Sequence, residues 1–176
     1  AIRGDRVTEI TACASPELYL RIDGRRITSG PIKGTAPIAA ELLPKDYAEN
    51  VMIVDLVRHD VGHVSRPGTV SVDHLCRVEE HPGLVHLVSD VSGTLRPGTT
   101  WRNLLDASFP PGSVSGAPKH TALQAIADLE PVPRGPYCGA VGWIDADNDG
   151  FVTRDEIQAG MKHHKKRGHG WGMGDN

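Results

Sequence analysis

Several features that would tie a protein to a particular partner or compartment are absent from this sequence or scarce in it. No apolar run approaches the roughly 20 residues that a membrane-spanning helix needs, and the first ten residues, AIRGDRVTEI, have no apolar core like that of a signal peptide. Nineteen lysine and arginine residues nearly balance 22 aspartate and glutamate residues, so the net charge is only −3. We therefore expect neither nucleic acid nor a membrane as a partner.

Cysteine is scarce as well, with Cys13, Cys76 and Cys138 spread over 176 residues. An odd number of widely spaced cysteines gives neither a disulfide framework nor a CxxC pair. A reducing cytoplasm is therefore the expected compartment. The contents of hydrophobic residues (39%) and charged residues (23%) are typical of a globular protein.

The patterns along the chain predict many short strands. Residues 18–22 and 26–32 are rich in residues that favour strands, and IDGRRI between them predicts a hairpin. Residues 66–98 predict further strands separated by Pro-Gly turns. Shorter strands are expected at 7–14 and 137–144.

Helices are expected at three places. Residues 45–61 carry a wide apolar face that includes Val51 and follow Pro44, a helix start signal. A short helix at 99–109 should be capped by Thr99 or Thr100. A Gly/Ser-rich loop at 112–118 leads into a third helix, for which the sequence offers a cap and a buried stripe: Ser115, and then Leu123, Ile126 and Leu129. The predicted fold class is α+β, with mainly antiparallel strands flanked by helices.

The stretch DADNDGFVTRDE, residues 145–156, matches the calcium loop of an EF-hand at all twelve positions. Six residues supply the expected calcium ligands, five by side chains and one by a backbone carbonyl: Asp145, Asp147, Asp149, Phe151 (carbonyl), Thr153 and Glu156. The preceding segment predicts a strand, whereas an EF-hand has a helix there. A plain polar hairpin turn is therefore the alternative. Beyond the loop we expect a short polar helix and a Gly-rich tail with three histidines, His163, His164 and His169.

Seven stretches between residue 7 and about residue 147 together resemble the chorismate-utilising enzymes, and occur in that family's order. They are ASPELYL, PIKGT, AENVMIVDLVRHDVG, PGTVSV, HPGLVHLVS, FPPGSVSGAPK and RGPYCGAVGWI. The lysine in PIKGT favours aminodeoxychorismate synthase component I over the related anthranilate synthase large subunit, which usually carries alanine there. The resemblance implies a partial chorismate-binding fold at 1–144, followed by the EF-hand-like loop, helix and tail at 145–176.

The resemblance also implies catalytic roles for three residues. Lys33 matches a lysine nucleophile that adds to the chorismate ring before ammonia displaces it, which requires part of the amine to be neutral. Glu17, sixteen residues earlier, matches an acid/base glutamate. His86 matches a histidine that contacts substrate and handles protons. Each has a plainer interpretation: a solvated lysine, a surface glutamate and a core histidine.

Two further sites follow from the same resemblance. Glu49 matches a magnesium ligand, although a glutamate in the first turn of a helix also complements the helix dipole. Ser115, Gly116 and Ala117 match a loop whose backbone N–H groups bind a substrate carboxylate at a helix N-terminus. An ordinary capped helix is the alternative for this loop.

The sequence departs from the family's pattern in several places. Ala36 stands where an arginine usually follows PIKGT. His59, within Arg58-His59-Asp60, stands where the family's RND motif has its asparagine. The helix that supplies the second magnesium glutamate is replaced by the calcium-like loop. We therefore expect a truncated, weakly active enzyme that aminates chorismate for p-aminobenzoate and folate synthesis, with a glutamine amidotransferase supplying ammonia.

Two other interpretations stay open. The chain is alternatively a calcium-binding protein with one EF-hand-like loop on a scaffold without catalysis. A third interpretation is a chain that folds in part and catalyses nothing.

Overall fold

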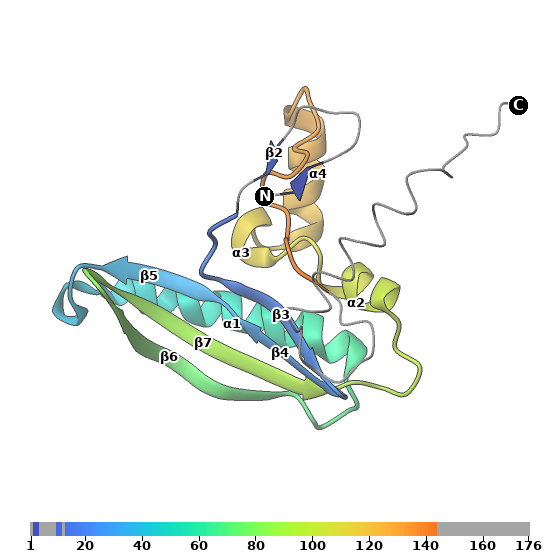
Figure 1. The fold of residues 1–176 in the computed structure, drawn as a ribbon, viewed down its shortest axis with the longest axis horizontal. Helices are drawn as coiled ribbons and strands as arrows, with labels where there is room; N and C mark the ends of the chain where they lie inside the picture. Colours follow the sequence, from blue (N-terminus) through green and yellow to red (C-terminus); the bar gives the residue numbers. More distant parts are fainter. Residues whose placement is uncertain (1, 4–9, 12, 144–176) are drawn as a thin grey trace, which may run out of the picture. The chain divides into compact units, whose positions relative to one another are not determined.

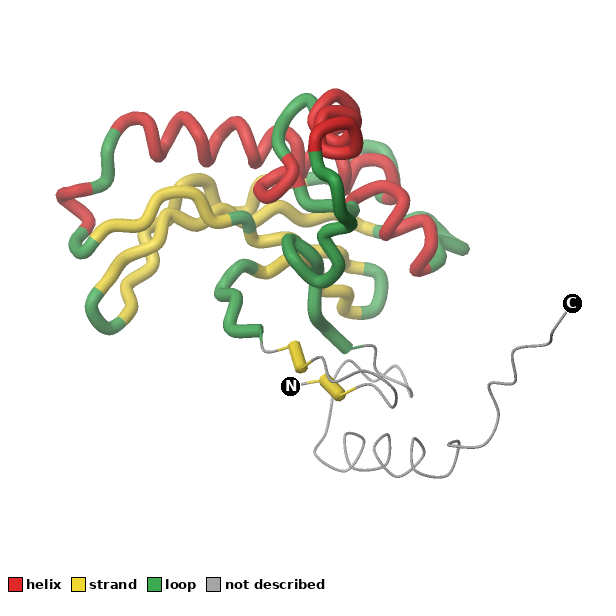
Figure 2. Tube along the Cα trace, turned by 90° about the horizontal axis from the view of Figure 1, so that it is seen from above, coloured by secondary structure: helices red, strands yellow, loops and turns green. Residues whose placement is uncertain are grey.

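An antiparallel sheet with a long helix against one face forms the main part of the structure (Figures 1 and 2). The computed structural model describes residues 2–3, 10–11 and 13–143. Its elements in chain order are β1 (Ile2–Arg3), β2 (Ile10–Thr11), β3 (Leu18–Asp23), β4 (Arg26–Gly30), β5 (Ile32–Ala36), η1 (Ala39–Glu41), α1 (Pro44–Val64), β6 (Ser71–His81), β7 (Leu84–Thr94), α2 (Trp101–Ser108), α3 (Gly112–Ser115) and α4 (Lys119–Leu129). The predicted α+β class with antiparallel strands is confirmed.

Strand β7 is the centre of the sheet, because it pairs with three other strands. One edge of β7 pairs along its length with β6, and the two are joined by the predicted Pro-Gly turn at Pro82–Gly83. The other edge pairs first with β5 and then with β4, which lie almost end to end along it (Figure 1). Strand β3 adds to β4 through the predicted hairpin, which closes at Asp23 and Arg26.

Helix α1 covers one face of the sheet (Figure 2) and contacts β5, β6 and β7. Pro44 occupies its first turn, where a missing backbone N–H has no consequence. Asp46 accepts a hydrogen bond from the backbone N–H of Leu43 at 2.8 Å and so caps the start. The buried side of α1 joins one core cluster: Ile27, Val54, Val61, Val64, Val91, Leu95 and Leu104. Removing these side chains from water stabilises the packing of helix on sheet.

A β-bulge interrupts the pairing of β5 with β7. Ile32 pairs with Val88 and Thr35 pairs with His86, so Lys33 and Gly34 both lie opposite the single residue Leu87. A bulge adds a residue to one strand and re-aims a side chain. Gly34 has a φ of +96°, which side chains rarely permit. A Cβ on Gly34 would also lie only 2.9 Å from the Cβ of Asp46 on α1.

The fully buried Asn50 of α1 satisfies the backbone at this bulge. Its amide nitrogen donates to the carbonyl of Leu87 at 2.9 Å and lies 3.5 Å from the carbonyl of Lys33. Its amide oxygen accepts a hydrogen bond from the hydroxyl of Ser89, and that hydroxyl also accepts from the backbone N–H of Cys76 at 2.8 Å. One side chain of α1 therefore connects three strands of the sheet and fixes the backbone of Lys33.

Several sequence predictions are wrong in detail. Residues 137–143 form turns and irregular backbone, because a strand needs a paired neighbour and no described strand lies beside them. Leu129 is 81% exposed, since nothing in the described part of the chain packs over that side of α4. Val51, expected on the buried face of α1, is exposed. Ser115 does not cap α4, because it belongs to α3 and its hydroxyl donates to the carbonyl of Pro111 at 3.0 Å.

Other predictions are confirmed or lie outside the described residues. Thr100 caps α2, since its hydroxyl accepts from the backbone N–H of Asn103 at 3.2 Å. Within the region the structure describes, no helix combines the length and apolarity needed to cross a membrane. Residues 1–141 group into one unit and 142–176 into a second. The whole calcium-like loop, 145–156, lies outside the described residues, so the domain boundary at 144 stays a prediction.

Replacing Asn50 by leucine should destabilise the fold sharply. The variant keeps similar volume but leaves the Leu87 carbonyl and the Ser89 hydroxyl without their partner, which should lower the free energy of unfolding by about 2–4 kcal/mol. Urea denaturation measures this loss. The matched control is Gln124→Leu, an amide on the exposed side of α4, which should change stability by less than about 0.5 kcal/mol. Equal effects of the two variants would show that the Asn50 contacts do not hold helix and sheet together.

Gly34→Ala should lower the free energy of unfolding more than an alanine substitution at a glycine that also has a positive φ but has free space around it. The alanine meets both a left-handed backbone, which costs about 1–3 kcal/mol, and the Cβ of Asp46. Gly24→Ala is the control, because Gly24 has a φ of +55° but no atom within 4 Å of its added Cβ. Urea denaturation gives the free energy of unfolding of both variants, and the difference between the two losses reports the steric contact at Gly34 apart from the backbone strain. Similar losses for both would mean that β5 and α1 do not meet closely at Gly34.

Candidate active site

The structure brings Glu17 and Lys33 together at one residue, Ser113 of α3. The amine of Lys33 donates to the carbonyl of Ser113 at 3.0 Å. The hydroxyl of Ser113 donates to Glu17 Oε1 at 2.5 Å. The two residues that the resemblance singles out, sixteen apart in sequence, thus share a neighbour that is about 80 residues further along the chain.

Local backbone geometry places each member of this Glu17–Lys33–Ser113 cluster. Glu17 directly precedes β3, and its Oε2 accepts from the backbone N–H of Ile32 at 3.1 Å, so its carboxylate lies against the start of β5. Lys33 sits in the bulge described above. Ser113 is held by the close approach of α3 to α1, because a Cβ on Gly112 would lie 2.0 Å from Leu56 Cδ2.

This cluster has the composition of a proton-transfer site beside a nucleophile. All three residues are half-buried, so water reaches them but does not surround them. The Glu17 carboxylate accepts one hydrogen bond from a backbone amide and one from a hydroxyl, which fixes its direction. The Lys33 amine has a single described partner, a carbonyl, and its other two donor positions are open to a ligand. An amine and a carboxylate held in this way are suited to addition and proton exchange.

His86 lies on β7, as its mid-strand position predicted, but it is not part of this cluster. Its Nδ1 is 2.9 Å from the hydroxyl of Thr35, its neighbour across the ladder. Its ring meets the ring of His81 edge to face, with centroids 5.1 Å apart. Its catalytic role therefore stays a prediction.

The structure places the residue expected to bind magnesium, Glu49, on the surface of α1 without other acidic ligands grouped around it among the described residues. Glu49 is exposed on α1, one residue before Asn50. The described residues contain no group of three or more His, Cys, Asp or Glu side chains placed to hold a metal ion. Magnesium usually keeps several waters and takes one or two protein carboxylates, so Glu49 alone would leave most ligand positions to water and substrate oxygens.

The loop with Ser115, Gly116 and Ala117 connects α3 to α4. Gly116 has a φ of +111°, and its N–H donates to the carbonyl of Gly112 at 3.0 Å, so that amide already has a partner. Helix α4 begins at Lys119 without a side-chain cap. Free N–H groups are therefore those of the first turn of α4 rather than that of Gly116.

A second polar cluster fastens the helices to one another. The buried Asp60 of α1 pairs with Lys119 of α4 at 2.5 Å, and Lys119 also lies 3.3 Å from the carbonyl of Ser108. Ser108 accepts from the hydroxyl of Tyr19 at 2.7 Å. Burial raises the pKa of the Tyr19 phenol, which keeps it protonated as a donor. This arrangement ties α1, α2 and α4 together and also connects them to β3.

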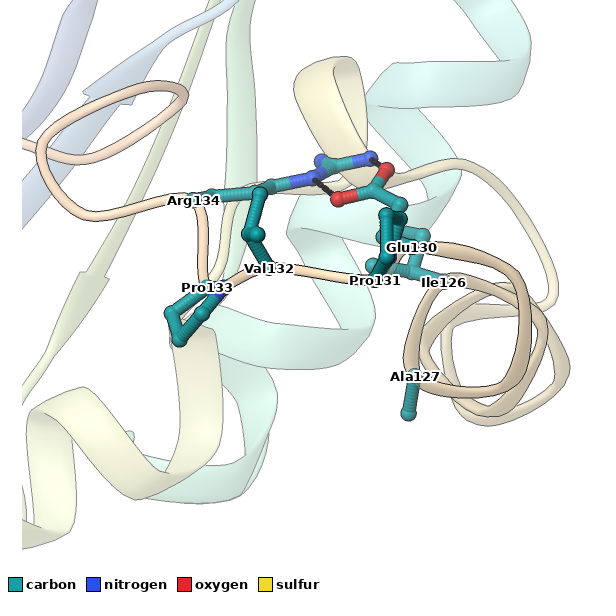
Figure 3. Close-up of a pocket in the computed structure, with 7 residues that line it drawn as sticks. All are labelled: Ile126, Ala127, Glu130, Pro131, Val132, Pro133 and Arg134. Atoms are coloured by element: carbon teal, nitrogen blue, oxygen red, sulfur yellow. Dashed lines mark hydrogen bonds and ion pairs between the residues drawn. The ribbon is translucent and has the colours of Figure 1, made fainter.

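A small cavity of about 300 Å³ lies at the end of α4 (Figure 3). None of the residues predicted to act in catalysis or to bind substrate or metal lines it. Its residues are Ile126, Ala127, Glu130, Pro131, Val132, Pro133 and Arg134. Glu130 and Arg134 face each other across it and form a two-pronged ion pair (Figure 3), which raises the pKa of Arg134 and lowers that of Glu130 through hydrogen bonding. The two charges of the pair offset each other, so the cavity carries no net charge from them.

Sequence reasoning missed two residues that organise the site. Ser113 stands inside the stretch FPPGSVSGAPK, but the predicted helix start favoured residues 115–117 as the substrate-binding loop. Asn50 is a polar residue within the apolar run of α1, and that interruption was an available signal, since a buried polar residue must find partners.

Comparison with known proteins gives the same family over most of the chain. The profile of the family described as chorismate binding enzyme matches residues 2–152. Anthranilate synthase component 1 of Saccharolobus solfataricus is 45% identical over an alignment of 148 residues, which covers 77% of this chain and 35% of that protein. Aminodeoxychorismate synthase component 1 of Klebsiella aerogenes is 39% identical over an alignment of 163 residues, which covers 85% of this chain and 36% of that protein.

A solved structure agrees with these sequence matches. The crystal structure of anthranilate synthase component I from Streptococcus pneumoniae TIGR4 matches with a TM-score of 0.66 and 37% identity, covering 78% of this chain and 32% of that one. The chain spans about one third of the length of the curated relatives it matches. Since the family profile covers most of its residues, the chain belongs to the chorismate binding enzyme family.

Proposed function

We propose that the chain carries the nucleophile and the acid/base group of an aminodeoxychorismate synthase component I-like enzyme, which replaces the hydroxyl of chorismate with an amino group. The observation that carries this proposal is the convergence of Lys33 and Glu17 on Ser113. Family membership supports chorismate or a close relative of it as the substrate.

In this proposal Lys33 and Glu17 divide the chemistry. The neutral amine of Lys33 adds to the chorismate ring and forms a C–N bond, while the C–O bond to the ring hydroxyl breaks. Glu17 gives its proton to the departing oxygen, which leaves as water, and the resulting carboxylate accepts a proton released by the amine. Ammonia then forms the product's C–N bond while the C–N bond to Lys33 breaks, and the proton that ammonia loses passes to the departing Lys33 amine.

Anthranilate synthase activity is the second candidate, because relatives with that name match the chain as strongly as the aminodeoxychorismate synthase does. The two products differ in two ways. Anthranilate carries its amino group ortho to the ring carboxylate and has lost pyruvate, whereas aminodeoxychorismate carries the amino group para to it and keeps the pyruvyl group. Lysine at position 33 favours the first activity, since the second needs no enzyme nucleophile. A glutamine amidotransferase is the proposed source of ammonia in either case.

We expect this 176-residue chain by itself to turn over slowly. The described residues contain no group of three or more His, Cys, Asp or Glu side chains placed to hold magnesium, and loss of charge stabilisation in the transition state lowers rates by orders of magnitude. The magnesium role of Glu49 remains a prediction.

Lys33→Ala should abolish aminodeoxychorismate formation from chorismate and ammonia, and Lys33→Arg should do the same, because arginine keeps the charge but cannot become a neutral nucleophile. Chromatography with mass detection measures the product and distinguishes it from anthranilate. Lys45→Ala is the control, an exposed lysine at the start of α1 that should leave the rate unchanged. Full product formation by Lys33→Ala would remove the lysine from the mechanism, and release of anthranilate by the unaltered chain would favour the second candidate.

Calcium binding at 145–156 is proposed separately, on the sequence match alone. Affinity should be on the order of the loosest EF-hands, about 10⁻⁴ to 10⁻³ M, since a single loop has no partner hand to stiffen it. Terbium luminescence on the unaltered chain and on Glu156→Gln tests this, with loss of signal expected in the variant. The same luminescence from both proteins, or none from either, would leave the stretch as a polar turn.

A further inference from the structure

Two histidines lie one helical turn apart on the exposed side of α1, and neither belongs to the Glu17–Lys33–Ser113 cluster. His59 and His63 have the i, i+4 spacing that places side chains next to each other on a helix. Their Nε2 atoms are 3.2 Å apart, and their rings meet edge to face with centroids separated by 4.5 Å. The side chain of His59 is 67% exposed, so an ion can reach the pair from solvent.

The separation of the two nitrogens matches the requirement of one metal ion. Zinc binds imidazole nitrogen at about 2.0–2.1 Å, so two nitrogens in a tetrahedral arrangement lie about 3.3 Å apart. At 3.2 Å the same two atoms are also within hydrogen-bond distance of each other. A proton on one of the two nitrogens would lie between them. Replacing that proton by a cation therefore needs little movement of either ring.

A buried carboxylate gives the His59 ring the orientation of a metal ligand. Nδ1 of His59 is 3.4 Å from Oδ1 of Asp60, and Lys119 holds the other oxygen of Asp60 at 2.5 Å. A histidine that directs its Nδ1–H to a carboxylate leaves Nε2 with a free electron pair, the arrangement usual for metal-bound histidines. The pairing of Asp60 with Lys119 keeps that carboxylate in place.

The pair also lines a wide groove, of about 1,100 Å³, between α1, α2 and the start of α4. Within the described residues no third His, Cys, Asp or Glu is placed to complete a metal site, so water or a ligand in the groove must fill the remaining positions. A metal held here by two ligands is open on the side of the groove.

We propose that His59 and His63 form a bis-histidine site for divalent transition-metal ions that favour imidazole, namely zinc, nickel and copper. Imidazole nitrogen suits these ions, whereas magnesium and calcium prefer oxygen. The site is thus chemically distinct from the magnesium role predicted for Glu49 and from the calcium loop.

Calorimetric titration with Ni²⁺ tests this proposal, once the histidines of the C-terminal tail are removed as competing ligands. The parent for the test is the full chain with His163→Ala, His164→Ala and His169→Ala, in which one Ni²⁺ per chain should bind. Adding His59→Ala or His63→Ala to that parent should weaken binding at least tenfold, because a chelate of two ligands becomes a single one. Adding His81→Ala, an exposed histidine on β6, should leave binding unchanged.

Thermal unfolding supplies a second measurement. Zn²⁺ bound across one turn of a native helix should raise the midpoint temperature of the parent, and should not raise that of the His63→Ala form. Circular dichroism checks that the variants keep their fold, which exposed positions should permit. Absence of Ni²⁺ binding by the parent would overturn the proposal, and so would binding by the His59→Ala or His63→Ala form that is as tight as binding by the parent. Displacement of bound Ni²⁺ by an excess of Mg²⁺ would overturn it as well.

Discussion

The buried amide of Asn50 is the constraint on which the geometry around Lys33 depends. A bulge in β5 removes the regular ladder partner of the Leu87 carbonyl, and the Asn50 nitrogen takes its place at 2.9 Å. The same side chain receives the Ser89 hydroxyl, so both ends of the amide are used. A buried polar group without partners is costly, which means that α1 has one register against the sheet in which all these groups are satisfied.

This constraint extends to the proposed catalytic cluster. With the Lys33 backbone fixed by the bulge, its amine reaches the carbonyl of Ser113, whose hydroxyl in turn holds Glu17. Gly34 makes this possible because only a residue without Cβ allows β5 to approach Asp46 on α1. The cluster therefore joins a strand, a bulge and a short helix, and no one of these elements would place the amine beside the carboxylate.

Helix α1 connects this cluster to the bis-histidine pair. Its first half carries Asn50 against the sheet, and its second half carries His59 and His63 on the solvent side and Asp60 on the buried side. Asp60 belongs to both environments, since it binds Lys119 of α4 and faces the Nδ1 of His59. A cation at the histidines would thus lie next to the ion pair that holds α4 against α1.

Much of the fold could be predicted from local sequence. Pro44 and the apolar repeat located α1, Asp-Gly located the β3–β4 turn, and Thr100 located the start of α2. These features depend on neighbours a few residues apart, whose preferences act before the chain folds. The expected strand at 137–144 and the buried position of Leu129 were wrong, because both depend on partners that sequence patterns do not supply.

The sequence by itself determined the family, the order of its motifs and the candidate residues Lys33 and Glu17, because short contiguous sequence motifs identify them. Only the tertiary structure decided that Ser113 joins the two, that His86 turns to Thr35 instead, and that two histidine nitrogens lie 3.2 Å apart. Such contacts are set by bulges, close helix approaches and side-chain rotamers. Their energies depend on groups far apart in the chain, and no local pattern encodes them.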